Sequence, residues 1–258
     1  MVNDQFIPPE LYPEWEKQEG WKGLDSLIEE IEALGRQALA VTTSINVKEE
    51  VEQMVAKAID RFGQIDILVN NAALHSHSSV PGVLDYYPLL EMTEDVWNRY
   101  LGVNIGGALL VSQAVVKHMK ERGQGGKIIN ISSRAGKRAS RNSAHYSVSK
   151  RGVIALTEVM ALEWAPYKIN VNVVCPGSVP TMAAEGRGKV ILKLMQDEGL
   201  TEEEAIARHY QSRLERIPLG RLGKPEDISK MVAFLASNQA DYITGEAISV
   251  NGGALLSM

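Results

Sequence analysis

Apolar residues recur with two different spacings along this chain of 258 residues. Between positions 23 and 35 they stand three and four residues apart, which predicts an amphipathic helix that stops at Gly35. The same spacing predicts further helices at 47–62, 95–119, 144–164 and 225–236. Short, nearly continuous apolar runs predict strands at 37–45, 65–69, 127–132, 169–175 and 247–250.

The predicted strands and helices alternate along the chain. Apolar strands separated by helices of ten or more residues are typical of a parallel sheet that is covered on both faces. The sequence therefore predicts an α/β protein with a doubly wound, Rossmann-like, mostly parallel sheet in three α/β/α layers. We expect a single domain over residues 1–258, with an irregular N-terminal segment at 1–22.

The segment 181–216 is the least regular internal part of the chain. It contains two runs with helical spacing, at 190–195 and 202–214. We interpret the segment as a helical lid over a substrate cleft. The alternative is an insertion on the surface without a role in binding.

Charge and cysteine content narrow the classes of function. A net charge of -5 without a long run of one sign argues against a nucleic-acid partner. The single cysteine, Cys175, cannot form an internal disulfide, which favours a reducing cytoplasm. The N-terminus lacks the pattern of a signal peptide, and no stretch of about 18 apolar residues occurs, so we expect no membrane span.

Tyr146 and Lys150 stand four residues apart in a predicted helix, which places both side chains on one face. A nearby ammonium stabilises a phenolate, so it lowers the pKa of the tyrosine. Tyr146 could then exchange a proton with a substrate oxygen. The alternative is an ordinary pair of residues on a surface helix.

Ser133 follows directly on the predicted strand 127–132. Ligands of doubly wound sheets bind beyond the carboxyl ends of the strands, so the hydroxyl of Ser133 could bind the substrate oxygen. The alternative is a serine that caps a helix or a turn.

Read together, these residues belong to a longer series of motifs. The series comprises Asn70-Asn71-Ala72-Ala73, Asn104 in VNIGG, Asn130-Ile131-Ser132-Ser133, Tyr146-Ser147-Val148-Ser149-Lys150, Pro176-Gly177-Ser178-Val179-Pro180-Thr181, Pro218-Leu219-Gly220-Arg221, Thr244-Gly245 and Asn251-Gly252-Gly253. With these motifs in this order, the chain resembles the short-chain dehydrogenase/reductase family from about Gly23 to Gly253.

The resemblance implies an NAD(P)-dependent oxidoreductase that moves hydride between nicotinamide and a secondary alcohol or ketone, such as a polyol or sugar. Tyr146 would be the general acid or base, Ser133 would polarise the substrate oxygen, and Lys150 would lower the tyrosine pKa and hold the nicotinamide ribose. Asn104 would anchor a water of the proton relay, the alternative being packing inside its helix. The expected cofactor contacts are Asp4, Asn70, Ala72, Tyr146, Lys150, Gly177, Val179 and Thr181.

The resemblance also implies a homotetramer. We assign no metal site, because His75 and His77 stand without a neighbouring carboxylate or cysteine and are more often solvated loop residues.

One expected motif is missing from the sequence. The family begins with a strand and a T-G-x-x-x-G-x-G turn that holds the pyrophosphate at a helix N-terminus, and this chain contains no such turn. Val2-Asn3-Asp4 resembles the end of the family's second strand, where Asp4 would hold the adenosine ribose and favour NAD, although NADP is not excluded. The alternative for Asp4 is a surface residue.

We therefore expect that the first strand is absent and that the chain responds in one of two ways. Either 37–45 pairs directly with 65–69, or the segment before Val47 is displaced and poorly ordered and the sheet begins at Ile65. The alternative function is an N-terminally truncated or catalytically silent relative that binds no dinucleotide.

Overall fold

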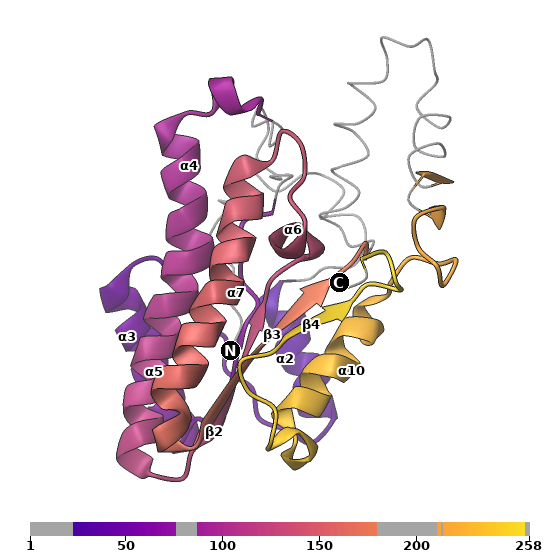
Figure 1. Ribbon diagram of the computed structural model, residues 1–258. Helices are drawn as coiled ribbons and strands as arrows, with labels where there is room; N and C mark the ends of the chain where they lie inside the picture. Colours follow the sequence, from indigo (N-terminus) through magenta and orange to yellow (C-terminus); the bar gives the residue numbers. More distant parts are fainter. Residues whose placement is uncertain (1–22, 76–86, 180–210, 213, 256–258) are drawn as a thin grey trace.

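The computed structural model describes residues 23–75, 87–179, 211–212 and 214–255. Four strands in this part of the chain form one parallel sheet in the order β1-β2-β3-β4 (Figure 1). The strands are β1 (Ile67–Asn70), β2 (Gly126–Ile131), β3 (Ile169–Pro176) and β4 (Ala247–Val250). The prediction of a parallel α/β sheet is confirmed.

Helices separate the strands as the apolar spacing predicts. They are α2 (Leu24–Ala33), α3 (Lys48–Phe62), α4 (Glu94–Leu101), α5 (Ala108–Arg122), α6 (Arg134–Lys137), α7 (Ala144–Trp164) and α10 (Pro225–Ala236). Short 3-10 turns lie at Leu89–Glu91, Ala165–Tyr167 and Asn238–Ala240. The predicted bounds of the helices at 144–164 and 225–236 agree with α7 and α10 to the residue.

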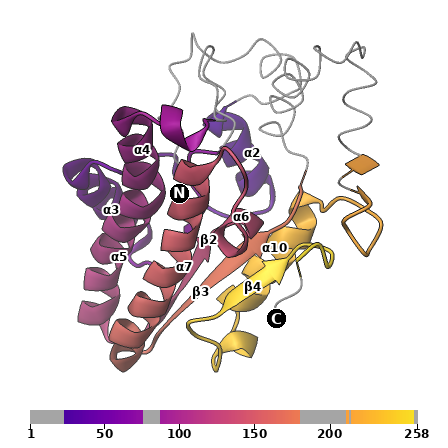
Figure 2. The same ribbon diagram turned by 45° about the horizontal axis from the view of Figure 1, so that its top comes forward.

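The side chains of β3 alternate between two apolar layers. Val171 and Val173 are fully buried in clusters with residues of α5 and α7, whereas Val174 is buried against Leu235 of α10. Helices α3, α5 and α7 thus cover one face of the sheet and α10 covers the other (Figures 1 and 2). This confirms the three-layer α/β/α arrangement.

A π-helix interrupts the helix that the spacing predicts over 95–119. It spans Gly102–Gly107, between α4 and α5, and it contains the buried Asn104. Single-turn π segments inside α-helices occur often at functional sites, because they shift the following side chains out of the regular spacing. The apolar periodicity alone does not reveal this interruption.

The continuous helical run Glu94–Arg122 is long and apolar enough to cross a membrane by length and composition. Its 29 residues contain a window with a mean hydropathy of 1.2. Half of that window is buried inside the protein, where α5 packs against α3 and the sheet. A buried core helix meets the same criterion, so the run is weak evidence for a membrane span.

The predicted strand at 37–45 is wrong. In the part of the chain that the structure describes, the backbone there pairs with no strand, although Val41, Thr43 and Ile45 are buried at every second position, as in an extended chain. Val41 and Ile45 pack on the layer of α3 and α5 instead. Of the two expected consequences of a missing strand, direct pairing with 65–69 is therefore wrong. Within the described residues the sheet begins at Ile67, and Val41 and Ile45 ahead of α3 are buried.

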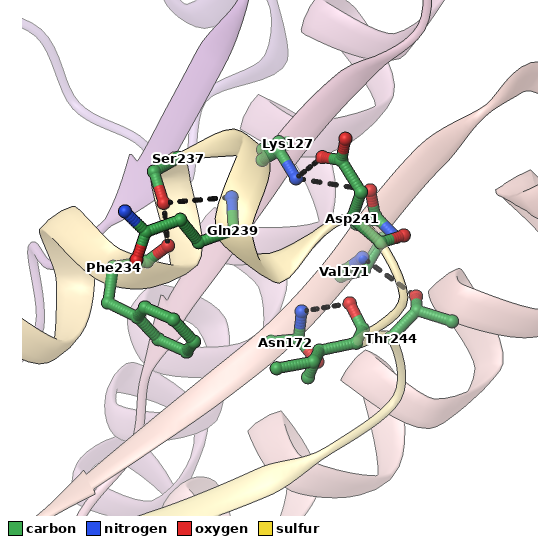
Figure 3. Close-up of polar contacts among 10 residues, drawn as sticks. Lys127, Val171, Asn172, Phe234, Ser237, Gln239, Asp241 and Thr244 are labelled. Carbon is green, nitrogen blue, oxygen red and sulfur yellow. Dashed lines mark hydrogen bonds and ion pairs between the residues drawn. The ribbon is translucent and has the colours of Figure 1, made fainter.

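Polar contacts fasten the amino ends of the strands to the segment between α10 and β4 (Figure 3). Lys127 Nζ donates to Asp241 Oδ1 over 2.7 Å. The backbone N–H of Val171 donates to Thr244 Oγ1 over 3.0 Å. The amino ends of β2 and β3 thus carry structural contacts. Ligands of doubly wound sheets bind beyond the carboxyl ends of the strands, so we expect the site there.

Several predictions fall on other parts of the chain. The irregular segment 1–22, with Asp4, lies outside the described residues, as does Thr181. The lid at 181–216 lies outside them as well, except for residues 211, 212 and 214–216.

Candidate active site

Tyr146 and Lys150 lie in the first two turns of α7. The Lys150 ammonium is 5.8 Å from the centre of the Tyr146 ring, so the two groups share one face of the helix as predicted. Only 9% of Tyr146 and 3% of Lys150 is exposed. Both residues are therefore buried, and the alternative of a surface helix pair is wrong.

Two hydrogen bonds join Lys150 to the end of β2. The Nζ of Lys150 donates to the carbonyl oxygen of Ile131 over 2.9 Å. The hydroxyl of Ser132 donates to the backbone carbonyl oxygen of Lys150 over 2.7 Å. Burial lowers the pKa of Lys150 to about 8, and the charge of Cys175 opposes this shift. Lys150 thus loses its charge closer to neutral pH than an exposed lysine does.

Ser133 lies at the junction of β2 and α6. Its Oγ accepts a hydrogen bond from the backbone N–H of Ala135 over 3.1 Å, so Ser133 caps the short helix α6. The capping alternative is thus present in the structure. A hydroxyl has one donor and two acceptor positions, so this contact leaves the O–H of Ser133 able to donate to a substrate oxygen.

Gly136 allows α6 to lie directly on α7. A Cβ at this position would be 2.7 Å from the carbonyl oxygen of Lys150 and 2.6 Å from Ser132 Oγ. Any side chain would therefore push α6, and Ser133 with it, away from the helix that carries Tyr146. The sequence reasoning missed this role, because a glycine inside a short helix has no pattern that points to it.

Asn104 joins the loop after β1 to α7. Its Oδ1 accepts from the backbone N–H of Leu74 over 2.7 Å, and its Nδ2 donates to the carbonyl of Leu74 over 3.0 Å and to Ser149 Oγ over 2.9 Å. Both N–H groups of the amide are used. A water of a proton relay could therefore bind this side chain only at the second lone pair of Oδ1.

The side chain of Asn70 belongs to a polar network inside the protein. Its Nδ2 donates to Ser112 Oγ over 2.9 Å and to Asn130 Oδ1 over 2.8 Å, while Asn130 Nδ2 donates to Thr157 Oγ1 over 2.8 Å. These bonds link β1, β2, α5 and α7. The buried asparagine within the apolar run 127–132 was the available signal for this network.

Gly177 and Val179 lie in the loop after β3. The N–H of Gly177 donates to the carbonyl of Val250 over 2.9 Å, and a Cβ on Gly177 would be 2.7 Å from the Cα of Asn251. The loop borders a pocket of about 150 Å³ that is also lined by Ser178, Arg221 and Asn251. A glycine is needed here because the loop packs closely against the end of β4.

The predicted cofactor residues fit one end of a dinucleotide. Ala72 follows β1, Lys150 is fastened to the end of β2 and Gly177 follows β3, so all three lie toward the carboxyl ends of the strands. This is where doubly wound sheets bind nucleotides. The described residues contain no T-G-x-x-x-G-x-G turn, so they fit the nicotinamide ribose and do not provide the usual pyrophosphate site.

A metal ion in a protein is usually held by several histidine, cysteine, aspartate or glutamate side chains. In the described residues no cluster of three or more such side chains occurs. Cys175 is fully buried beside the end of β2, and burial raises the pKa of its thiol. A buried thiol of raised pKa is a poor nucleophile.

Residues 21–254 match a family model described as enoyl-(acyl carrier protein) reductase. A solved putative short-chain alcohol dehydrogenase from Sinorhizobium meliloti superposes with a TM-score of 0.76 and 30% identity, over 92% of this chain and 84% of that chain. The chain belongs to the short-chain dehydrogenase/reductase family. It is thus an NAD(P)-dependent oxidoreductase that acts on CH–OH groups of secondary alcohols or on the corresponding ketones.

Two curated relatives act on sugars or sugar acids according to their names. L-rhamnose 1-dehydrogenase (NAD(P)(+)) from Azotobacter vinelandii is 34% identical over 240 residues, which cover 93% of this chain and 84% of the relative. 2-dehydro-3-deoxy-D-gluconate 5-dehydrogenase from Escherichia coli is 36% identical over 228 residues, which cover 88% of this chain and 80% of the relative.

Proposed function

We propose that this chain interconverts a secondary alcohol and a ketone in a sugar or polyol, with Tyr146 as the group that transfers the proton. The observation that carries this proposal is the buried Tyr146 and Lys150 pair at the carboxyl end of β2. The names of the two curated relatives support a polyhydroxylated substrate. We propose NAD as the cofactor, with NADP as the alternative.

The site residues have separate tasks in this proposal. The phenol of Tyr146 takes the proton from the substrate hydroxyl during oxidation and returns it during reduction. Ser133 donates a hydrogen bond to the same oxygen and so fixes its position. Lys150, held by the carbonyl of Ile131, stabilises the phenolate form of Tyr146. The bound nicotinamide supplies the hydride acceptor or donor.

Asn104 positions the site in this proposal. Its three hydrogen bonds hold Leu74 beside Ser149, one turn from Tyr146. The loop after β1 is thereby kept at the helix that carries the proton-transferring group. Asn70, Ala72, Gly177 and Val179 would hold the cofactor, with Asp4 and Thr181 completing the set that the family resemblance implies.

The experiment is a direct assay of the purified chain. L-rhamnose and a panel of other sugars and polyols are incubated with NAD or NADP at millimolar concentration, and the absorbance of reduced nicotinamide is followed. We expect turnover with at least one polyhydroxylated substrate. Complete inactivity with every sugar and both cofactors would contradict the proposal.

A second candidate is a relative that keeps the fold but binds no dinucleotide. The absence of a T-G-x-x-x-G-x-G turn from the sequence favours it. Titration with NAD and NADP, followed by the fluorescence of the four tryptophans, separates the two candidates. A saturable change in fluorescence supports the enzyme, and a flat titration up to the solubility limit supports the silent relative.

For assembly and location we propose a cytoplasmic homotetramer that acts without a membrane or nucleic-acid partner. Exposed apolar residues on α7 support an interface, since 49% of Val159 and 78% of Leu162 is exposed. Val153, on the same helix, is buried in the core and is not available to an interface. Light scattering tests the assembly, and a stable monomer would contradict it.

A further inference from the structure

Leu74 and His75 follow β1 and are held at their backbone by three hydrogen bonds. Asn104 binds both the N–H and the carbonyl of Leu74. The hydroxyl of Tyr100 donates to the carbonyl of His75. A loop residue whose backbone is held by two neighbouring side chains has a defined position, so the fold sets the direction in which the side chain of His75 leaves the backbone.

Tyr100 is itself fixed by the helix that carries Tyr146. Its ring is 3% exposed and packs edge-on against His145, with ring centres 4.2 Å apart and planes at 80°. His145 is fully buried at the start of α7, and burial lowers its pKa to about 4. At neutral pH the imidazole of His145 is therefore uncharged and serves as a packing surface for Tyr100.

The imidazole of His75 lies close to the phenol that is proposed to transfer the proton. The ring centres of His75 and Tyr146 are 6.5 Å apart, and the rings are tilted by 36°. His75 is exposed, whereas Tyr146 is 9% exposed. The backbone contacts of Leu74 and His75 thus keep a polar, exposed side chain close to the phenol of Tyr146.

We propose that His75 is a specificity-determining residue that forms a hydrogen bond with a hydroxyl next to the reacting carbon of a polyhydroxylated substrate. A neutral imidazole carries one donor and one acceptor nitrogen, which suits a hydroxyl group. With ring centres 6.5 Å apart, the two side chains are close enough to bind neighbouring oxygens of one substrate. This inference rests on the proposed function, and it names the group that reads the substrate.

The test compares L-rhamnose with cyclohexanol, a ring of similar size that has only one hydroxyl. The variants are His75→Phe, which keeps the ring shape, and His75→Gln, which keeps donor and acceptor atoms. His118→Gln is the control, because His118 lies on α5 and contacts the backbone of Ile65. The apparent kcat and KM of each protein for the substrate are measured at one fixed, millimolar concentration of NAD.

We expect His75→Phe to lower kcat/KM for L-rhamnose about tenfold, mainly through KM, because one hydrogen bond to the substrate is lost. Its kcat/KM for cyclohexanol should stay within about twofold of the wild type, and His75→Gln should recover part of the loss. Equal losses for both substrates, or no loss for either, would overturn the inference. If the wild type turns over neither cyclohexanol nor any sugar of the panel, the result counts against the proposed function instead.

A second measurement does not depend on turnover. The imidazole proton signals of His75 are assigned in the NMR spectrum by their absence from His75→Gln, and L-rhamnose is then added. We expect the signals of His75 to shift while those of His118 stay in place. If the His75 signals do not move at L-rhamnose concentrations that saturate any other response, His75 does not contact the sugar.

Discussion

The inner strands of the sheet and its outer strand β1 differ sharply in how they are covered. Ile129 of β2 is 1% exposed and Val174 of β3 is fully buried, whereas 46% of Ile67 and 41% of Val69 in β1 is exposed. Strands of parallel sheets are normally covered on both faces. In the described residues β1 has a neighbouring strand on one side only, and its other side borders a pocket of about 380 Å³.

This difference separates the two parts of the proposed chemistry. The proposed proton-transfer residues Ser133, Tyr146 and Lys150 depend on β2, α6 and α7, which pack against each other and against β3. The hydrogen bonds of Ser133 and Lys150 stay within β2, α6 and α7 and the short link after β2. Binding of the cofactor phosphates needs a strand end and a helix N-terminus, and the described residues offer no such pair beside β1. The described residues thus contain the proposed proton-transfer groups, whereas they offer no such phosphate site beside β1.

The largest effect that we expect is weak binding of NAD to the chain of this sequence. Without a glycine-rich turn, the dissociation constant should lie above about 1 mM, roughly a thousandfold weaker than micromolar binding. Calorimetry with NAD and NADP measures it directly. A micromolar constant would show that another backbone turn holds the phosphates, and would remove the contrast between the two parts of the site.

A matched pair of substitutions compares the packing of the two strands. Ile129→Ala in β2 removes a fully covered side chain and should lower the free energy of unfolding by about 2–5 kcal/mol. Ile67→Ala in β1 removes a half-exposed one and should cost about 1 kcal/mol or less. Urea unfolding followed by tryptophan fluorescence gives both values. Equal losses of stability would mean that β1 is covered in solution to the same extent as β2.

Tyr146→Phe removes only the phenolic hydroxyl, so it should lower kcat at least about a hundredfold. Cofactor affinity should change little, since the ring and its packing remain. Tyr242→Phe is the matched control, because Tyr242 is fully exposed and follows Asp241, which contacts Lys127 at the amino end of β2. Near-normal turnover of Tyr146→Phe would end the proposed role of this residue.

Lys150→Met should trade activity for stability. The pKa of Lys150 falls from 10.5 to about 8 on folding, so burial of the charged amine opposes folding below about pH 8. This penalty fades as the pH rises from about 8 toward 10.5, because the unfolded chain then also loses the proton. We expect Lys150→Met to be more stable than the wild type by about 1 kcal/mol at pH 7, after the lost hydrogen bond to Ile131 is subtracted.

The same comparison at about pH 10 sharpens this prediction. The stability advantage of Lys150→Met should shrink there, since the wild type no longer buries a charge. Thermal unfolding at both pH values measures the change. If Lys150→Met is less stable than the wild type at both values, its hydrogen bond outweighs the cost of burying the charge.

The sequence by itself determined the alternation of elements and the core of the site. Apolar spacing is a local property, so the bounds of α7, α10 and β4 follow from it closely. The placement of Tyr146 and Lys150 on one face also follows, because a helix brings residues four apart together whatever surrounds it. Family motifs then named Ser133 and Asn104 without showing what they contact.

Tertiary structure decided everything that depends on a partner distant in the chain. The segment 37–45 has the alternation of a strand, but a strand needs a neighbour to pair with, and this segment packs on α3 and α5 instead. The contacts of Asn104 with Leu74, of Gly136 with α7 and of Tyr100 with His75 likewise join residues that no local pattern relates. Local spacing selects helix or strand, whereas pairing and packing depend on which surfaces meet when the chain folds.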